Sequence, residues 1–164
     1  MRRVATQVLV IGGGPVGLST ALHLDKQGVA CLLVERHPTT AFHPRASYFN
    51  VRTMEILRQL GIADEVYETA LFPTGVSFYT KLRGHKLGVL SGADYPDHLE
   101  RVMRSTASPG CVSSQIVLEA ILKRHAERGR HTTVLFHHEQ IAIEQDDRGV
   151  RSMVVDRATG EELR

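Results

Sequence analysis

The 164-residue sequence contains little cysteine and no long apolar run. Its two cysteines, Cys31 and Cys111, are too few for the disulfide framework of a small secreted domain. Cys31 lies in an apolar segment, so we expect a free thiol in a buried strand. No uninterrupted apolar stretch has the length that crosses a membrane, and residues 1–3 lead into a predicted strand rather than a cleavable signal. These absences favour a cytoplasmic protein without a membrane partner.

The sequence also lacks a block of like charges. Its 20 lysine and arginine residues nearly balance 18 aspartate and glutamate residues, and the formal net charge is +2. Because there is no basic block and no stripe of aromatic and basic residues, we expect no nucleic-acid partner. The nine histidines lack metal-site spacing with the cysteines, and His137 and His138 would face opposite sides of a strand. We therefore expect no metal site.

The sequence does contain a glycine-rich bend between two apolar segments. Residues 8–11, "VLVI", are continuously apolar, which predicts a strand buried on both faces of a parallel sheet. Apolar spacing predicts a helix over residues 15–27, with Pro15 in its first turn, where a missing N–H costs no hydrogen bond. The apolar run 29–34 predicts the next strand. Together the three segments predict a β-α-β unit.

Gly12, Gly14 and Gly17 fall at G-x-G-x-x-G spacing within this unit. The first glycine permits a tight turn out of the strand, the second lets a pyrophosphate approach the backbone, and the third lets the helix lie close to the sheet. The helix start adds unpaired N–H groups and the positive end of the helix dipole. The pattern therefore predicts a dinucleotide site.

Two charged residues end the second predicted strand. Glu35 follows Gly17 by 18 residues, where a carboxylate can accept hydrogen bonds from both ribose hydroxyls of a dinucleotide. The alternative for Glu35 is a solvated strand end. The acid disfavours a 2′-phosphate by repulsion, although the neighbouring Arg36 weakens this argument against NADP.

Residues 37–50 predict a loop, because they contain two prolines and mixed polar residues. Asn50 is expected to cap a helix over residues 51–60, which Gly61 would end. Arg45 lies in the loop before this helix. It is either a phosphate ligand that folds back over the nucleotide or a solvated loop arginine.

Residues 71–111 form an excursion from the nucleotide-binding fold. Their periodicity is poor, and it predicts two short strands around residues 83–85 followed by largely irregular chain. A helix is then expected over residues 113–128, with Gln115 in its first turn, where the amide either caps the helix or meets a cofactor. The expected buried face of this helix consists of Ile116, Val117, Ala120, Ile121 and Leu122.

The last part of the chain predicts more strands. Residues 132–136 predict a third parallel strand, and Ile141 and Ile143 begin an alternating pattern that returns through residues 150–156 as an antiparallel meander. The chain stops at Arg164 shortly after a further turn. We expect a third meander strand to be cut there, which would leave an edge open to self-association.

Four segments, taken in order, resemble the amino-terminal portion of flavin-dependent aromatic hydroxylases. These are the single-component monooxygenases related to p-hydroxybenzoate and phenol hydroxylases. The segments are "VLVIGGGPVGLSTALHL", "CLLVER", "PRASYFNVRTMEILRQLGI" and "SSQIVLEAILKRHA". The resemblance spans nearly the whole chain. It implies a Rossmann-like FAD-binding α/β fold with a parallel sheet, a β excursion and a carboxy-terminal meander.

The resemblance also implies a domain organisation. Residues 1–70 would form an FAD-binding segment, residues 71–111 an excursion toward a substrate domain, and residues 112–164 the continued FAD-binding domain. In the family, an Asp-Gly segment and a Gly-Asp segment follow further along and close over FAD. Because neither follows here, we expect a truncated chain that lacks its carboxy-terminal half and is inactive by itself.

By resemblance, the FAD-binding residues are Gly12, Gly14, Pro15, Gly17, Glu35, Arg36, Arg45 and Gln115. The glycines would border the pyrophosphate. Glu35 and Arg36 would attend the adenosine. Arg45 would reach the phosphates and the isoalloxazine region, and Gln115 would contact the flavin from its helix.

The resemblance implies an NAD(P)H-dependent monooxygenase that uses FAD and O₂ to hydroxylate a small aromatic substrate of phenolic or polyketide-like type. No catalytic residue is identified from the sequence. Two other functions stay open: an NAD(P)-dependent dehydrogenase, and a non-catalytic nucleotide-binding fragment. The dehydrogenase has no support beyond the β-α-β unit, whereas the segments around Arg45 and Gln115 favour flavin.

Overall fold

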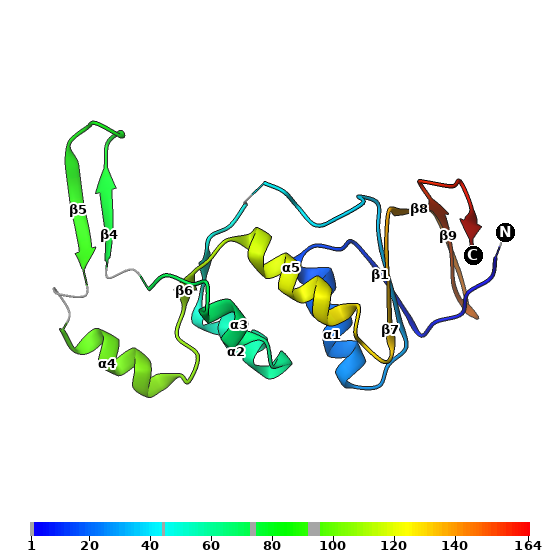
Figure 1. The fold of residues 1–164 in the computed structure, drawn as a ribbon, viewed down its shortest axis with the longest axis horizontal. Helices are drawn as coiled ribbons and strands as arrows, with labels where there is room; N and C mark the ends of the chain where they lie inside the picture. The colour runs from blue at the N-terminus through cyan, green and yellow to red at the C-terminus, as the bar shows by residue number, and fades with distance from the viewer. Residues whose placement is uncertain (1, 44, 73–74, 92–95) are drawn as a thin grey trace. The chain divides into compact units, whose positions relative to one another are not determined.

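The computed structural model describes residues 2–43, 45–72, 75–91 and 96–164 (Figure 1). The chain divides into two compact units, which we call the first unit (Met1–Arg45 with Gln115–Arg164) and the second unit (Ala46–Ser114). The domain assignment that the family resemblance implies stays a prediction.

A parallel three-stranded sheet is the centre of the first unit. Its strands, in the order β1-β2-β7, are β1 (Val8–Ile11), β2 (Cys31–Glu35) and β7 (Thr132–Phe136). Both outer strands pair with β2 in parallel. The first four residues of β2 are buried, because a central parallel strand is covered on both faces. The predicted parallel sheet is confirmed, but β1 is an outer strand with no buried residue and is not covered on both faces as expected.

Two helices cover one face of this sheet, α1 (Pro15–Lys26) and α5 (Gln115–Ala126). They contact each other along their lengths (Figure 1). Leu18 and Ala21 are fully buried on α1. Helix α5 begins two residues later than expected. Its buried face also differs from the expected one, since Ala120 is exposed whereas Glu119 is buried.

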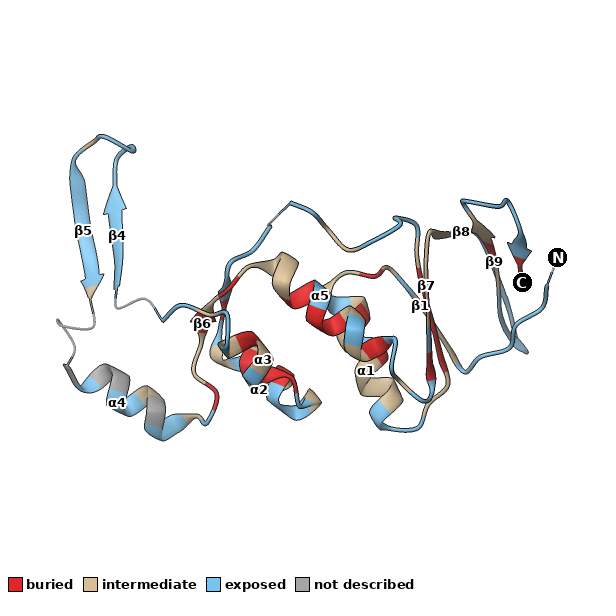
Figure 2. Cartoon of the chain, in the orientation of Figure 1, coloured by how far each residue is buried: buried red, intermediate tan, exposed pale blue. Residues whose placement is uncertain are grey.

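An antiparallel meander covers the other face. It consists of β8 (His138–Asp146), β9 (Gly149–Asp156) and β10 (Glu162–Leu163), in the order β10-β9-β8. Because successive strand residues point to opposite faces, alternate β2 residues meet the meander. Leu32 and Val34 of β2 form a buried cluster with Val154 and Leu163 of the meander (Figure 2). The predicted meander is confirmed, and its third strand is the short β10.

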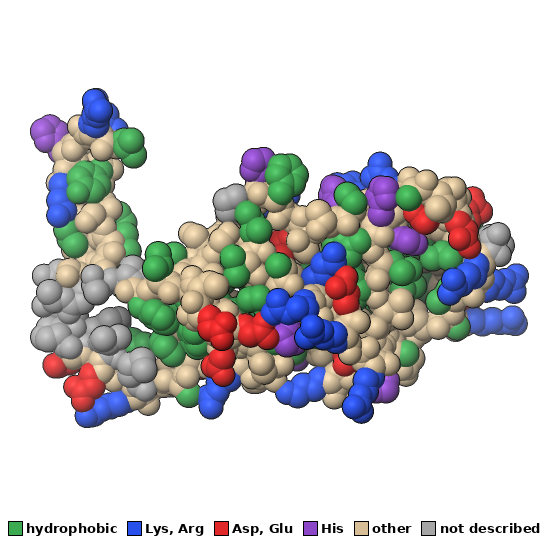
Figure 3. All heavy atoms as spheres, viewed as in Figure 1, with side chains coloured by type: hydrophobic (Ala, Val, Ile, Leu, Met, Phe, Trp, Pro, Cys, Tyr) green, Lys and Arg blue, Asp and Glu red, His purple; other side chains and the backbone are tan. Residues whose placement is uncertain are grey.

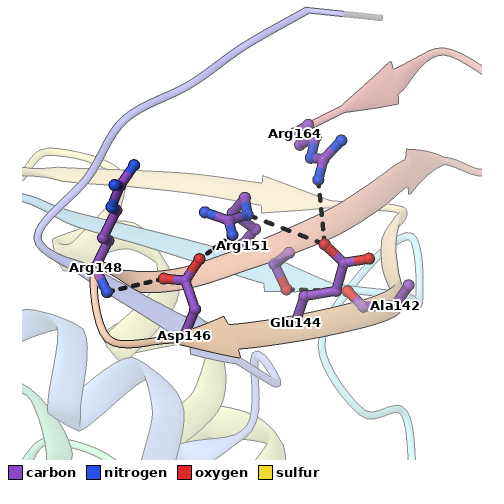
Figure 4. A network of polar contacts seen from close by, with 7 residues as sticks. Ala142, Glu144, Asp146, Arg148, Arg151 and Arg164 are labelled. Atoms are coloured by element: carbon purple, nitrogen blue, oxygen red, sulfur yellow. Dashed lines mark hydrogen bonds and ion pairs between the residues drawn. The ribbon is translucent and has the colours of Figure 1, made fainter.

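Charged side chains join the exposed strands of the meander (Figure 4). Asp146 accepts a hydrogen bond of 2.8 Å from the Arg148 N–H and pairs with Arg151. Glu144 lies 3.2 Å from the Arg164 guanidinium. The hydrogen bond from Arg148, followed by that from Arg151, holds the pKa of Asp146 below its ordinary value. Exposed pairs of this kind stabilise a fold only slightly, so the buried cluster holds the meander in place.

The second unit contains short elements. They are β3 (Tyr48–Phe49), α2 (Val51–Leu60), α3 (Ala63–Tyr67), β4 (Gly75–Tyr79), β5 (Lys86–Ser91), α4 (Pro96–Ser105) and β6 (Cys111–Val112). Asn50 caps α2 by accepting a 2.9 Å hydrogen bond from the Thr53 N–H, and Gly61 ends it with a φ of 80°. The predicted helix and its two signals are confirmed.

The excursion expected over residues 71–111 is only partly described, since residues 73–74 and 92–95 lie outside the described residues. The two predicted strands are present as the hairpin β4–β5, whose hydrophobic side chains are exposed (Figure 3). The irregular chain expected after the hairpin is corrected, because α4 forms there. Its start at proline suits a first helical position, and Glu100 pairs with Arg104 one turn later at 2.5 Å.

Both cysteines are buried free thiols, as expected for Cys31. Burial raises the pKa of the Cys31 thiol and of the Cys111 thiol. Among the described residues, no helix has the length and apolar character of a membrane span. The described residues also hold no cluster of three or more histidine, cysteine or acidic side chains that suits a metal ion.

Candidate dinucleotide-binding site

The glycine bend lies between β1 and α1, at the carboxyl edge of the parallel sheet. Ligands of open parallel sheets bind outside this edge. Gly12 has a φ of +110°, a conformation that residues with a side chain rarely adopt, and its N–H donates a 2.8 Å hydrogen bond to the Val34 carbonyl. The turn out of β1 therefore requires glycine at position 12 for backbone reasons alone.

Gly17 is required for a different reason, which is close packing. A Cβ atom at position 17 would lie 1.9 Å from the Gly12 carbonyl oxygen and 3.3 Å from Cγ1 of Val10. The first turn of α1 thus lies directly against the bend and the end of β1. No side chain fits between them.

Gly14 has neither constraint. Its φ of −80° and ψ of −175° are an extended conformation that any residue adopts. Apart from Gly14 and its two chain neighbours, no described residue has an atom within 4 Å of a Cβ built at position 14. Because nothing inside the chain needs glycine here, the space beside Gly14 suits an approaching ligand.

The start of α1 suits an anion. Its N-cap is Gly14, which has no capping side chain, and Pro15 occupies the first helical position. The first turn contains no acidic residue. The helix dipole and the N–H groups of the first turn are therefore not neutralised by a carboxylate of this turn. The space at Gly14 and this helix start together fit the pyrophosphate of a dinucleotide.

Sequence reasoning missed Gly13, which packs against the ends of two strands. A Cβ at position 13 would lie 2.8 Å from Cβ of Glu35 and 3.0 Å from Cζ of Phe136. The Gly13 N–H donates a 2.7 Å hydrogen bond to Oε2 of Glu35. The signal was the unbroken run of three glycines, of which the G-x-G-x-x-G pattern explains only two.

Glu35 is held by the main chain at the end of β2. Besides the bond from Gly13, its Oε1 accepts hydrogen bonds from the His37 N–H at 2.8 Å and lies 2.6 Å from Nδ1 of His37. Burial by itself would raise the pKa of Glu35, but the hydrogen bonds from Gly13 and His37 outweigh it and hold this pKa below its ordinary value. Glu35 is therefore an oriented, ionised carboxylate rather than a freely solvated strand end.

No hydrogen bond among the described residues joins either predicted arginine to the glycine bend. Arg36 and Arg45 are both exposed, and within the described ranges neither takes part in a hydrogen bond or an ion pair. Their predicted contacts with the adenosine and the phosphates stay predictions.

Gln115 is the first residue of α5, and its position at the sheet edge follows from the topology. Both α1 and α5 precede a parallel strand, and so both run from the carboxyl edge to the amino edge. The end of α1 is tied to the start of β7, because the His131 N–H donates a 2.6 Å hydrogen bond to Asp25 and Thr132 Oγ1 donates one of 3.2 Å to the Ala21 carbonyl. The start of α5 therefore lies at the same edge as the glycine bend.

Sequence reasoning also missed Glu119, which lies one turn after Gln115. Oε1 of Glu119 accepts a 2.5 Å hydrogen bond from Nε2 of Gln115. Oε2 accepts a 2.8 Å hydrogen bond from the Ala41 N–H, in the loop that follows β2. The signal was a glutamate four residues after a glutamine within an otherwise apolar helix face.

A model of the FAD binding domain family matches residues 5–164. The chain is 34% identical over 164 residues to 4-methyl-5-nitrocatechol 5-monooxygenase of a Burkholderia species, covering 97% of this chain and 29% of that protein. It is 37% identical over 175 residues to tetracenomycin B2 monooxygenase-dioxygenase of Streptomyces olivaceus, covering 98% of this chain and 32% of that protein.

A solved structure is also similar. It is the flavin-dependent monooxygenase PieE in complex with FAD and substrate, with a TM-score of 0.87 and 36% sequence identity. The match covers 99% of this chain and 29% of that chain. The chain therefore spans roughly three tenths of the length of these proteins.

Proposed function

The chain belongs to the FAD binding domain family, and from this membership we propose that it is the FAD-binding part of a flavin-dependent monooxygenase that hydroxylates an aromatic substrate. The observation that carries the proposal is the open space beside Gly14, where neither the backbone nor the packing of the described chain requires glycine. A pyrophosphate that approaches the backbone explains why position 14 is glycine.

Different residues of the first unit would bind different parts of FAD. The bend at Gly12 and Gly14 and the uncapped start of α1 receive the pyrophosphate. Three donors from Gly13 and His37 occupy three of the roughly four acceptor positions of the Glu35 carboxylate, which leaves room for a ribose hydroxyl at Oε2. Glu35 is thus held in place before the cofactor arrives.

Three further residues complete the proposed site. Arg36 lies next to Glu35 at the strand end and would accompany the adenosine. Arg45, exposed in the loop after β2, would reach the phosphates and the isoalloxazine region. Gln115, at the start of α5, would contact the flavin.

The reductant, oxidant and substrate are further parts of the proposal. Bound FAD supplies the redox chemistry, with NAD(P)H as electron donor and O₂ as the source of oxygen. Two similar proteins are named for a nitrocatechol and for tetracenomycin B2, which supports an aromatic substrate of phenolic or polyketide type. The second unit, with its exposed hairpin β4–β5, would extend toward the substrate.

An NAD(P)-dependent dehydrogenase is the alternative enzyme. The glycine bend suits either dinucleotide, so the β-α-β unit does not separate the two functions. Membership of an FAD-binding family and the similarity to PieE favour FAD.

The test is a titration of the purified 164-residue chain with FAD and, separately, with NAD⁺. Bound FAD changes its absorption spectrum and its fluorescence. Gly14→Val places a branched side chain in the space beside the bend, and we expect it to weaken FAD binding at least about tenfold without changing the melting temperature.

Gly88→Val is the matched control. It adds the same side chain in β5, where no described atom lies within 4 Å of a Cβ, and it should leave FAD affinity unchanged. Equal FAD affinity in Gly14→Val and in the unaltered chain would remove Gly14 from the site. Binding of NAD⁺ without binding of FAD would support the dehydrogenase instead.

A further inference from the structure

Glu119 is a buried carboxylate to which the proposed function assigns no role. Its exposed fraction is 2%, and it lies on the inner side of α5. Its two oxygens accept from the Gln115 amide and from the Ala41 N–H, both of which are uncharged.

Burial of a carboxyl group is costly, and hydrogen bonds must offset that cost. A neutral apolar residue would avoid the cost altogether on a helix face that also buries Leu118 and Leu122. The carboxylate therefore does something that an apolar side chain does not do. What it does in this structure is to fix the orientation of two donors.

The orientation of the Gln115 amide follows from the chemistry of Glu119. Both oxygens of Glu119 act as acceptors, and the Gln115 amide directs its NH₂ group toward Oε1 of Glu119. The carbonyl oxygen of Gln115 and the second N–H of its amide then stay available to a ligand in a fixed orientation.

The second donor connects Glu119 with the loop that carries Arg45. Ala41 lies between the end of β2 and Arg45, and its N–H is held 2.8 Å from Oε2 of Glu119. One carboxylate thus connects the helix that presents Gln115 with the loop that presents Arg45. Both segments lie at the carboxyl edge of the sheet, together with the glycine bend.

We propose that Glu119 is a positioning residue of the FAD site, an inference that rests on the proposed function. It fixes the Gln115 amide so that Gln115 offers the cofactor a hydrogen-bond acceptor, and it anchors the loop before Arg45. Through its carbonyl oxygen, Gln115 recognises a donor of FAD, such as the ring N–H of the flavin or a ribityl hydroxyl.

The first variant for the test is Glu119→Gln, which keeps the shape of the side chain. A neutral amide at position 119 can accept from the Ala41 N–H only if its own NH₂ group faces Gln115. The Gln115 amide must then turn, and it offers the cofactor its NH₂ group in place of its carbonyl oxygen. We expect the FAD dissociation constant to rise about tenfold or more, because the cofactor loses the acceptor at position 115. Glu127→Gln, just after α5 and exposed, is the matched control and should bind FAD as the unaltered chain does.

The second variant exchanges the two side chains, Gln115→Glu with Glu119→Gln. In this double variant the amide at position 119 donates to the carboxylate at position 115 and still accepts from the Ala41 N–H, so every hydrogen bond is restored. Position 115 again offers the cofactor an oxygen acceptor. We expect FAD affinity to return to within about threefold of the unaltered chain, a rescue that a merely structural role of the charge at position 119 does not produce.

Circular dichroism establishes that each variant is folded. Unchanged FAD affinity in Glu119→Gln overturns the proposal, and so does a folded double variant that binds FAD as weakly as Glu119→Gln. If Glu119→Gln does not fold, the double variant alone decides between the same two outcomes. Failure of the unaltered chain to bind FAD would instead overturn the proposed function, which distinguishes the two failures.

Discussion

Gly17 and Gly14 belong to one motif, but they are glycines for different physical reasons. Position 17 has no room for a Cβ, which would meet the Gly12 carbonyl oxygen at 1.9 Å, whereas position 14 is open. The close contact at Gly17 lies within the chain itself, whereas the space at Gly14 is open to a ligand. Folding and binding therefore depend on different glycines of the bend.

We expect Gly17→Ala to lower the free energy of unfolding by about 2–3 kcal/mol, because the helix and the bend must move apart to admit the methyl group. Gly14→Ala is the matched variant and should unfold within about 0.5 kcal/mol of the unaltered chain. Urea denaturation followed by circular dichroism measures both. Equal stability of the two variants would show that the close approach at Gly17 does not matter for folding.

Glu35 makes stability depend on pH in a defined direction. Its pKa in the folded chain is lowered below the ordinary value of 4.5, so it contributes stability that is present above pH 4.5 and is lost as the pH falls through the lowered pKa. The contribution comes from the hydrogen bonds of Gly13 and His37 to the ionised form.

Glu35→Gln should therefore be less stable than the unaltered chain at pH 7, and the difference should shrink progressively below about pH 4.5. Denaturation curves of both proteins, recorded between pH 7 and pH 3 in steps of about half a pH unit, measure this difference. Asp146 and Asp156 also have lowered pKa values, but both proteins contain them, and their effect cancels. A difference that does not change with pH would contradict the ionic role of Glu35.

At the scale of elements, α2 shows how local signals determine a helix. Asn50 accepts from the Thr53 N–H at the start, and Gly61 adopts a left-handed conformation at the end. Met54 and Leu57 are buried on one side. The capping bond satisfies one of the N–H groups that have no partner within the helix.

Asn50→Ala should destabilise the second unit by about 1 kcal/mol, because this N–H group loses its acceptor. Asn50→Asp keeps an acceptor at the cap and should restore most of the loss. Thermal unfolding followed by circular dichroism compares the three proteins. An alanine variant with the melting temperature of the unaltered chain would show that water replaces the capping hydrogen bond without loss of stability.

At the scale of the whole molecule, the layers of the first unit cover both faces of the parallel sheet. The groups proposed to bind a ligand lie at one edge of this sheet. Helices α1 and α5 cover one face and the meander covers the other through Val154 and Leu163 (Figure 2). The bend, Glu35 and the start of α5 all lie at the carboxyl edge. The complete reaction is a proposal, because the chain spans only about three tenths of the length of its relatives.

Much of the fold was predictable because its signals are local. The apolar run of β1, the glycine spacing and the helical periodicity after Pro15 are close together in the sequence, and they predict the β-α-β unit correctly. Helix α2 has the predicted bounds, Val51–Leu60, because both of its caps are adjacent to it. In α4 the pattern was too weak to predict the helix that forms.

The sequence by itself determined most of the first unit's elements and the glycine bend, because periodicity, capping and motif spacing act over a few residues. Only the tertiary structure decided the partners of the buried polar groups. Glu35 meets Gly13 across 22 residues, and Glu119 meets Ala41 across 78 residues. Such contacts depend on how strands and helices pack, and no local pattern encodes which distant N–H group a buried carboxylate reaches.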